Sequence, residues 1–97
     1  MDIVADWKDR ILAAHERIRS IVLETPVVSS SHPSRYISQL VKFKLENQQR
    51  TGSFKFRGAA NSLSLLTAEQ ARAGVLTSST GNHGLAVATA AKTLGIR

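Results

Sequence analysis

The sequence predicts an α/β fold, in which helices flank an open parallel sheet that this chain leaves incomplete. Helical and extended patterns alternate in the order helix, strand, helix, strand, helix, which is typical of a parallel sheet. Such a sheet needs more than three strands to bury its faces, so the sequence looks like the opening of a longer chain. The 97 residues are 42% hydrophobic and 21% charged, which is the composition of a globular protein.

The first predicted helix starts at Asp6 and covers about four turns. Its apolar residues recur at intervals of three and four, the spacing of one helical face, at Trp7, Ile11, Ala14 and Ile18. The helix should end before Pro26, because the residue before a proline avoids the helical region. His15 is expected on its solvated surface.

Extended segments and a short helix follow in the first half of the chain. Residues 26–28 favour a strand, and residues 34–41 favour a short helix capped by Ser34. Residues 41–46 alternate strictly, which predicts a strand with one buried side formed by Val41, Phe43 and Leu45.

The second half of the chain is predicted to form three helices around one strand. A helix that starts at Ser53 or Gly52 should carry Lys55 and run to about Leu66. Thr67 and Gln70 have the spacing of a capping box for a further helix, which Gly74 closes. Residues 75–78 are predicted as a strand and residues 82–94 as a helix rich in alanine.

Composition limits the possible partners. The absence of cysteine excludes disulfides, thiolate metal sites and a cysteine nucleophile in this chain, and no metal site is predicted. The net charge of +6 favours small anions, whereas the scattered basic residues and 5% aromatics argue against nucleic acid. No apolar run is long enough to span a bilayer and no signal-peptide segment is visible, so we expect no membrane partner and a cytoplasmic location.

The stretch TGSFKFRG, residues 51–58, places Lys55 between two phenylalanines. It could be an ordinary helix start with Lys55 and Arg57 in solvent. Alternatively, a lysine held among apolar groups has a lowered pKa, which frees the amine for Schiff-base chemistry with carbonyls such as the aldehyde of pyridoxal phosphate.

The stretch SSTGNHG, residues 78–84, lies at the next junction of strand and helix. It could be a glycine turn with local caps. Alternatively, its backbone N–H groups at a helix N-terminus could bind a carboxylate or phosphate, which an enzyme acting on amino acids would need.

Both motifs, together with ETP at residues 24–26, closely resemble the N-terminal part of fold-type II pyridoxal-phosphate enzymes, in the threonine/serine dehydratase and serine racemase branch. The resemblance covers about residues 17–96 and implies a tryptophan-synthase-β-like fold with pyridoxal 5'-phosphate as cofactor. It implies that Lys55 forms the Schiff base and moves protons at Cα, that Phe54 packs beside the cofactor ring, and that Asn82 hydrogen-bonds the cofactor's phenolic oxygen. The substrate carboxylate would be held by Ser79, Thr80, Gly81, Asn82 and His83.

The implied reaction is β-elimination of water from a hydroxy amino acid, which yields a 2-keto acid and ammonia. Thr80 keeps a hydroxyl where serine racemases carry a catalytic serine, so it is a second candidate catalytic residue and racemase chemistry stays open. Hydroxyaspartate dehydratase and hydroxyectoine-pathway dehydratase are further alternatives. Arg57 is interpreted as structural, anchoring nearby carboxylates or carbonyls.

The resemblance also sets expectations for the extent of the chain. Residues 1–73 would form the N-terminal part of the large cofactor-binding domain, and residues 74–97 the start of a truncated small domain. The family's phosphate loop and metal site would lie beyond Arg97, so we expect this fragment to be inactive alone, and the full-length enzyme to be a homo-oligomer. A non-catalytic fragment that acts as an interaction module through an exposed sheet edge is the alternative from another class.

Overall fold

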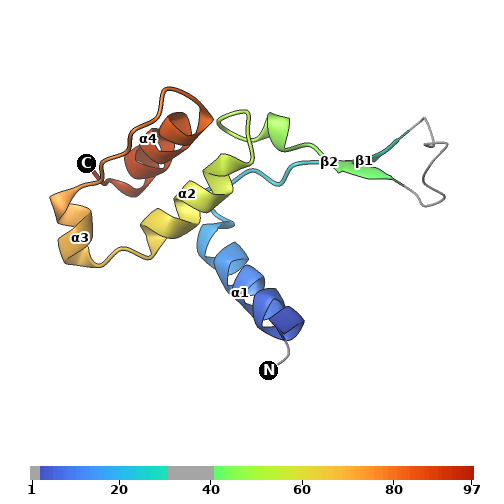
Figure 1. Ribbon diagram of the computed structural model, residues 1–97, viewed down its shortest axis with the longest axis horizontal. Coiled ribbons are helices and arrows are strands. Elements are labelled where there is room, and N and C mark those ends of the chain that lie inside the picture. Colours follow the sequence, from blue (N-terminus) through green and yellow to red (C-terminus); the bar gives the residue numbers. More distant parts are fainter. Residues whose placement is uncertain (1–2, 31–40) are drawn as a thin grey trace.

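The computed structural model describes residues 3–30 and 41–97 of the chain. In these residues five α-helical or 3-10 helical segments and two strands follow one another (Figure 1). Their bounds are α1 Ile3–Ile18, β1 Val27–Ser29, β2 Lys42–Lys44, η1 Glu46–Gln48, α2 Lys55–Ser64, α3 Ala68–Ala73 and α4 Asn82–Leu94. The predicted helix over residues 34–41 falls mainly outside the described residues.

The core lies between α2 and α4. Helix α2 buries Phe56, Ala59, Ala60 and Leu63, and α4 buries Ala86, Val87, Ala90 and Ala91. Phe56 is the largest fully buried side chain. Because the facing positions are mostly alanine, the two helices can approach closely around this one ring. The predicted start and end of α4 are confirmed, and a left-handed Gly95 with φ 70° ends the helix.

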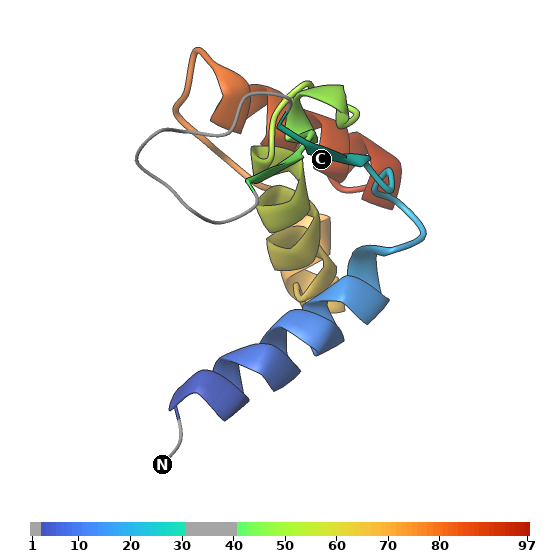
Figure 2. The ribbon, with the colours of Figure 1, turned by 90° about the vertical axis from the view of Figure 1, so that its right-hand side faces the viewer.

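Helix α1 projects from this core as a separate arm (Figure 2). Its last residue, Ile18, is buried together with Val22, but Trp7 and Ile11 are 53% and 61% exposed. The predicted inward face is therefore wrong for the N-terminal half of α1, because no described element packs against it. Helix α1 begins at Ile3, before the predicted start, and ends at Ile18, before Pro26 as predicted. The N–H groups of Ile21 and Val22 both donate to the Ile18 carbonyl in the turn that follows.

The two described strands form an antiparallel hairpin, and the predicted parallel sheet is not completed within the described residues. Val27 pairs with Lys44, Val28 with Phe43 and Ser29 with Lys42. Val41 and Leu45 are partly buried but Phe43 is 53% exposed, so the predicted burial of this strand face fails at its centre. Alternation sets which side chains share a face, but burial requires a second layer, and in the described chain none covers this hairpin (Figure 1).

The predicted strand at residues 75–78 is extended but unpaired along most of its length. One backbone bond joins it to the chain after α4, from the Val75 N–H to the Arg97 carbonyl at 2.7 Å. Helix α4 lies between these two segments in the chain, so the bond joins the residues before and after a helical connection. A single bond is too short a ladder to form a strand, and Leu76 remains fully exposed.

Helix α3 begins as predicted. The Thr67 hydroxyl accepts the Gln70 N–H and the Gln70 side chain accepts the Thr67 N–H, so the capping box is confirmed. Gly74 closes the helix with φ 87°, and a Cβ there would lie 2.7 Å from the Arg97 carbonyl oxygen. This position therefore requires glycine both for its conformation and for the approach of Arg97. The division of the chain into residues 1–73 and 74–97 stays a prediction.

Candidate functional site

Lys55 is the first residue of α2 and its side chain is exposed. The two flanking phenylalanines differ sharply in their surroundings, since Phe54 is 67% exposed and Phe56 is completely buried. Neighbouring helical residues point about 100° apart, so Phe56 faces the core while Lys55 faces outward. The expectation that both rings desolvate the Lys55 amine is therefore wrong in this structure.

A cavity of about 530 Å³ lies beside Lys55, between the start of α2, residues 75–77 and the first turns of α4. It brings together Phe54, Lys55 and His83, which come from the two motifs that the sequence singles out. Its remaining lining is largely apolar, formed by Gly58, Ala59, Ser62, Leu63, Val75, Leu76, Thr77 and Val87. The cavity therefore combines a primary amine, an aromatic ring and an imidazole over an apolar floor.

The loop before α4 lies next to this cavity in the chain but does not line it. Ser79, Thr80, Gly81 and Asn82 are all exposed, and of the predicted substrate-binding residues only His83 reaches the cavity wall. The Ser79 hydroxyl accepts the Gly81 N–H at 3.2 Å. No side chain caps α4, so the N–H groups of its first turn remain available to an anionic group.

Gly84 holds this loop against the helix. A Cβ at position 84 would lie 2.7 Å from the Ser79 carbonyl oxygen and 3.3 Å from the Ser79 Cβ. A contact as short as the first of these does not occur in folded proteins without a shift of one partner. The glycine in the motif is thus required for close approach of the backbone.

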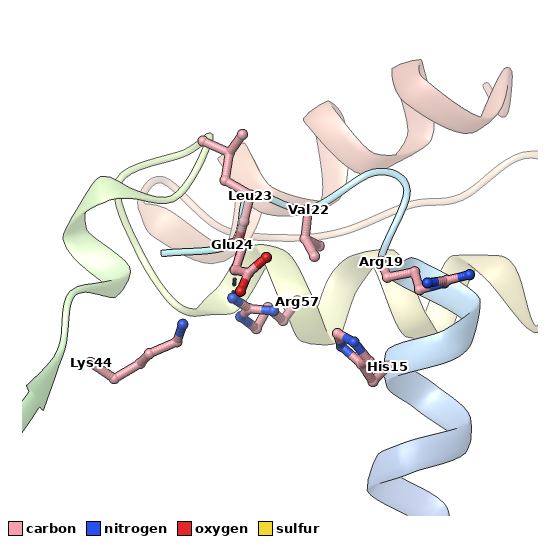
Figure 3. A pocket seen from close by; sticks show the side chains of 7 residues that line it. All are labelled: His15, Arg19, Val22, Leu23, Glu24, Lys44 and Arg57. Atoms are coloured by element: carbon pink, nitrogen blue, oxygen red, sulfur yellow. Dashed lines mark hydrogen bonds between the residues drawn. The ribbon is translucent and has the colours of Figure 1, made fainter. Parts of the chain in front are cut away.

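Arg57 anchors the start of α2. Its Nε and Nη2 atoms donate to the two carboxylate oxygens of Glu46 at 3.0 and 2.9 Å, and Nη2 also donates to the Leu23 carbonyl at 3.1 Å. Figure 3 shows the Arg57 side chain beneath the segment that carries Leu23 and Glu24. The interpretation of Arg57 as a structural anchor of carboxylates and carbonyls is confirmed.

Glu46 is held ionised by these contacts. The hydrogen bonds from Arg57 lower the pKa of Glu46 from 4.5 to about 2, against the opposing effect of burial and with help from the Thr25 hydroxyl. That hydroxyl donates to Glu46 at 2.6 Å, and Thr25 is only 4% exposed. The threonine of the ETP motif thus helps to position the carboxylate that forms the ion pair with Arg57 of α2.

Sequence reasoning missed Glu46 and Gln49 as partners in this network. The Gln49 side chain accepts the Leu23 N–H at 2.9 Å and donates to the Leu23 carbonyl at 3.0 Å, so it pairs with the backbone as a strand would. Gln49 is 4% exposed. In the sequence these residues stand between the alternating segment 41–45 and the loop that contains Gly52. Many polar loops contain a glutamate and a glutamine in such a place, so the sequence did not indicate their role.

The residues of the Lys55 cavity fit the cofactor that the resemblance implies. A primary amine can bond the aldehyde of pyridoxal phosphate, the Phe54 ring offers a flat apolar surface, and the cavity volume suits a small ligand. Within the described part of the chain, no three acidic or histidine side chains come together in a way that could hold a metal ion. None of the described helices has the length and apolar character needed to cross a membrane.

Comparison with known proteins identifies relatives of two activities. The chain is 47% identical over 95 residues to a serine racemase of Schizosaccharomyces pombe, covering 98% of this chain and 29% of the relative. It is 46% identical over 84 residues to a catabolic L-threonine dehydratase of Staphylococcus aureus, covering 86% and 24%. The solved structure of maize serine racemase superimposes with a TM-score of 0.81 at 46% identity, over 91% of this chain and 28% of that structure.

These matches also give the extent of the chain relative to its family. It spans less than a third of the length of the curated relatives, and its structural neighbours are fold-type II enzymes that use pyridoxal phosphate. The sequence profile of pyridoxal-phosphate dependent enzymes matches residues 18–97, from the buried end of α1 to the last residue. The chain therefore belongs to the pyridoxal-phosphate dependent enzyme family.

Proposed function

We propose that this chain supplies the lysine-bearing part of an enzyme that removes water from a hydroxy amino acid, giving a 2-keto acid and ammonia. The observation that carries the proposal is the cavity in which Lys55, Phe54 and His83 meet, because it joins the two sequence motifs in space. The similarity to a threonine dehydratase supports the reaction type. Pyridoxal phosphate, when bound, delocalises the electron pair that proton loss leaves at the substrate Cα.

In this proposal Lys55 has two roles. Its amine would hold the cofactor covalently and, when free, would take the proton from the substrate Cα. The ion pair between Arg57 and Glu46 holds the backbone of the first turn of α2, where Lys55 lies. The Lys55 side chain is exposed and keeps the freedom of movement that proton transfer requires. Phe54 orients the flat ring beside the amine.

The loop of residues 79–83 orients the substrate. The N–H groups at the start of α4 would bind the substrate carboxylate, since they lack intrahelical partners and the helix dipole favours an anion there. Asn82 is the proposed donor to the cofactor's phenolic oxygen. Because these groups lie beside the cavity rather than in it, a small closing movement of the loop would complete the site.

Racemisation of serine is the second candidate function. Two observations favour it, namely the serine racemases among the relatives and the Thr80 hydroxyl in the loop before α4. A hydroxyl on the opposite side of the substrate from Lys55 could return a proton to Cα with inverted configuration. If the enzyme is a dehydratase alone, Thr80 is a bystander.

A chimera tests both candidates. This chain would replace the 95 aligned residues of the Schizosaccharomyces pombe enzyme, which are 29% of that protein, so that the chimera regains the rest of the fold. We expect the chimera to release 2-keto acid from serine or threonine, and Lys55→Ala to lower the rate by at least about a hundredfold. Thr80→Ala should suppress racemisation alone if Thr80 transfers a proton. Full activity of the Lys55→Ala chimera would refute the assignment of Lys55.

The isolated chain allows an independent test of the Lys55 site. Pyridoxal phosphate followed by borohydride reduction should label Lys55 before Lys92, which is also exposed but lies on the far part of α4 outside the Phe54 cavity. Peptide mapping by mass spectrometry reports the label at each lysine. Equal labelling of both lysines would show that the cavity does not select the cofactor in this chain.

A further inference from the structure

A second hollow of about 490 Å³ lies on the other side of α2. It is enclosed by the end of α1, the connection to β1, strand β2 and helix α2, and shares no residue with the Lys55 cavity. Its lining residues are His15, Arg19, Val22, Leu23, Glu24, Lys44 and Arg57 (Figure 3). Three parts of the chain that are distant in sequence, residues 15–24, Lys44 and Arg57, thus converge on one polar depression.

Cations outnumber carboxylates among the residues that line this hollow. Three cations, Arg19, Lys44 and Arg57, line it together with a single carboxylate, Glu24. Arg57 and Arg19 form ion pairs with Glu46 and Glu16, which lie outside the lining, so the excess of cations is confined to the lining itself. Clustered like charges in a concave site raise the local concentration of ions of the opposite sign.

Two of these cations retain unused hydrogen-bond donors. Lys44 gives one of its three N–H groups to the Thr25 carbonyl at 2.5 Å. Arg57 uses Nε and Nη2, and in the described residues its Nη1 group has no hydrogen-bond partner. In Figure 3 the Lys44 ammonium points toward the Arg57 guanidinium, His15 lies on the other side of Arg57, and Arg19 stands at the rim.

We propose that this hollow binds a phosphoryl group, either free phosphate or the phosphate of a small metabolite. Its oxygens accept from the free N–H groups of Lys44 and from Nη1 of Arg57, which offsets the repulsion between these two cations. The rim residues Arg19 and His15 add attraction, and the volume leaves room for a small organic group beside the phosphate. Arg57 lies two residues after Lys55, so the hollow includes a residue from the first turn of α2.

Titration of the 97-residue chain with inorganic phosphate at constant ionic strength tests the proposal. Amide shifts in two-dimensional NMR should cluster at His15, Arg19, Lys44 and Arg57. Lys44→Met should weaken binding about tenfold, the loss of one charge-assisted hydrogen bond. Lys92→Met removes the same charge from an exposed position on α4 and should bind as the wild type does.

Two further variants distinguish the hollow from the Lys55 cavity and from general attraction of anions to a basic chain. Lys55→Ala should bind phosphate with unchanged affinity, because Lys55 lies outside the hollow. If Lys44→Met does not fold, Arg19→Gln serves instead, with an expected loss of about two- to threefold because this side chain is 65% exposed. Equal weakening by Lys44→Met and Lys92→Met, or shifts spread over all basic residues, would overturn the proposal. Tighter binding of succinate than of phosphate would overturn the phosphoryl assignment.

Discussion

Replacing Glu46 with glutamine tests the ion pair that anchors the lysine-bearing helix. Glutamine keeps the shape of the side chain but removes the charge that accepts two hydrogen bonds from Arg57. The chain would be unfolded with urea and followed by circular dichroism at several pH values. The quantity of interest is the difference in free energy of unfolding between wild type and Glu46→Gln.

The pKa of Glu46 sets the size of this difference. A decrease from 4.5 to about 2 on folding corresponds to about 3 kcal/mol, at about 1.4 kcal/mol for each pKa unit. The Arg57 and Glu46 side chains are 28% and 15% exposed, so solvent screens part of this interaction. We therefore expect Glu46→Gln to cost about 2 kcal/mol at pH 7.

The pH dependence has a definite sign. Because folding lowers this pKa, the stabilisation by Glu46 is fully present above pH 4.5 and is lost as the pH falls toward 2. The difference between wild type and Glu46→Gln should therefore shrink across this window. Glu16→Gln is the matched control, since Glu16 pairs with Arg19 on the exposed surface of α1 and should change stability by less than about 0.5 kcal/mol. A difference between wild type and Glu46→Gln that stays constant from pH 7 to about pH 2.5 would refute the linkage.

Two matched pairs of substitutions test the packing around the site. Gly84→Ala should destabilise the chain by about 1–3 kcal/mol, because its Cβ would lie 2.7 Å from the Ser79 carbonyl oxygen. Gly58→Ala, within α2, has free space for a Cβ and should stabilise the chain by about 0.5–1 kcal/mol. Thermal unfolding of the two variants measures this difference. Phe56→Ala should cost about 3–5 kcal/mol, or prevent folding, because the ring is fully buried. Phe54→Ala should leave stability nearly unchanged, because this ring is exposed, and should reduce labelling of Lys55 by pyridoxal phosphate. Equal losses of stability at positions 54 and 56 would contradict the assigned orientations of the two rings.

The local elements of the second half of the chain were predictable from the sequence because their signals are local. The Thr67 and Gln70 capping box, the glycine stops at positions 74 and 95 and the bounds of α4 each depend on residues a few positions apart. The family assignment also rested on sequence, since two motifs in the right order and spacing are specific even without a fold. The matched profile over residues 18–97 confirms that assignment.

Burial and pairing could not be predicted in the same way. The apolar face of α1 and the alternation around Phe43 predict buried surfaces, but both remain exposed where no described element covers them. The described strands pair as an antiparallel hairpin, and the predicted strand at residues 75–78 has only the single bond between Val75 and Arg97. Periodicity specifies which residues share a face, whereas the partner layer comes from segments distant in the chain.

The sequence by itself determined the identity of the candidate reactive residue and the positions of the helices around it, because amine chemistry and helix signals depend on residue type and short spacing. Only the tertiary structure decided which of the two phenylalanines accompanies Lys55, since helical geometry sends Phe56 into the core and leaves Phe54 at the cavity. It also decided that Arg57 forms an ion pair with Glu46, 11 residues away, and that Lys44, Arg19 and Arg57 line the same hollow. Such contacts depend on how elements pack against one another, a property that no single segment of sequence contains.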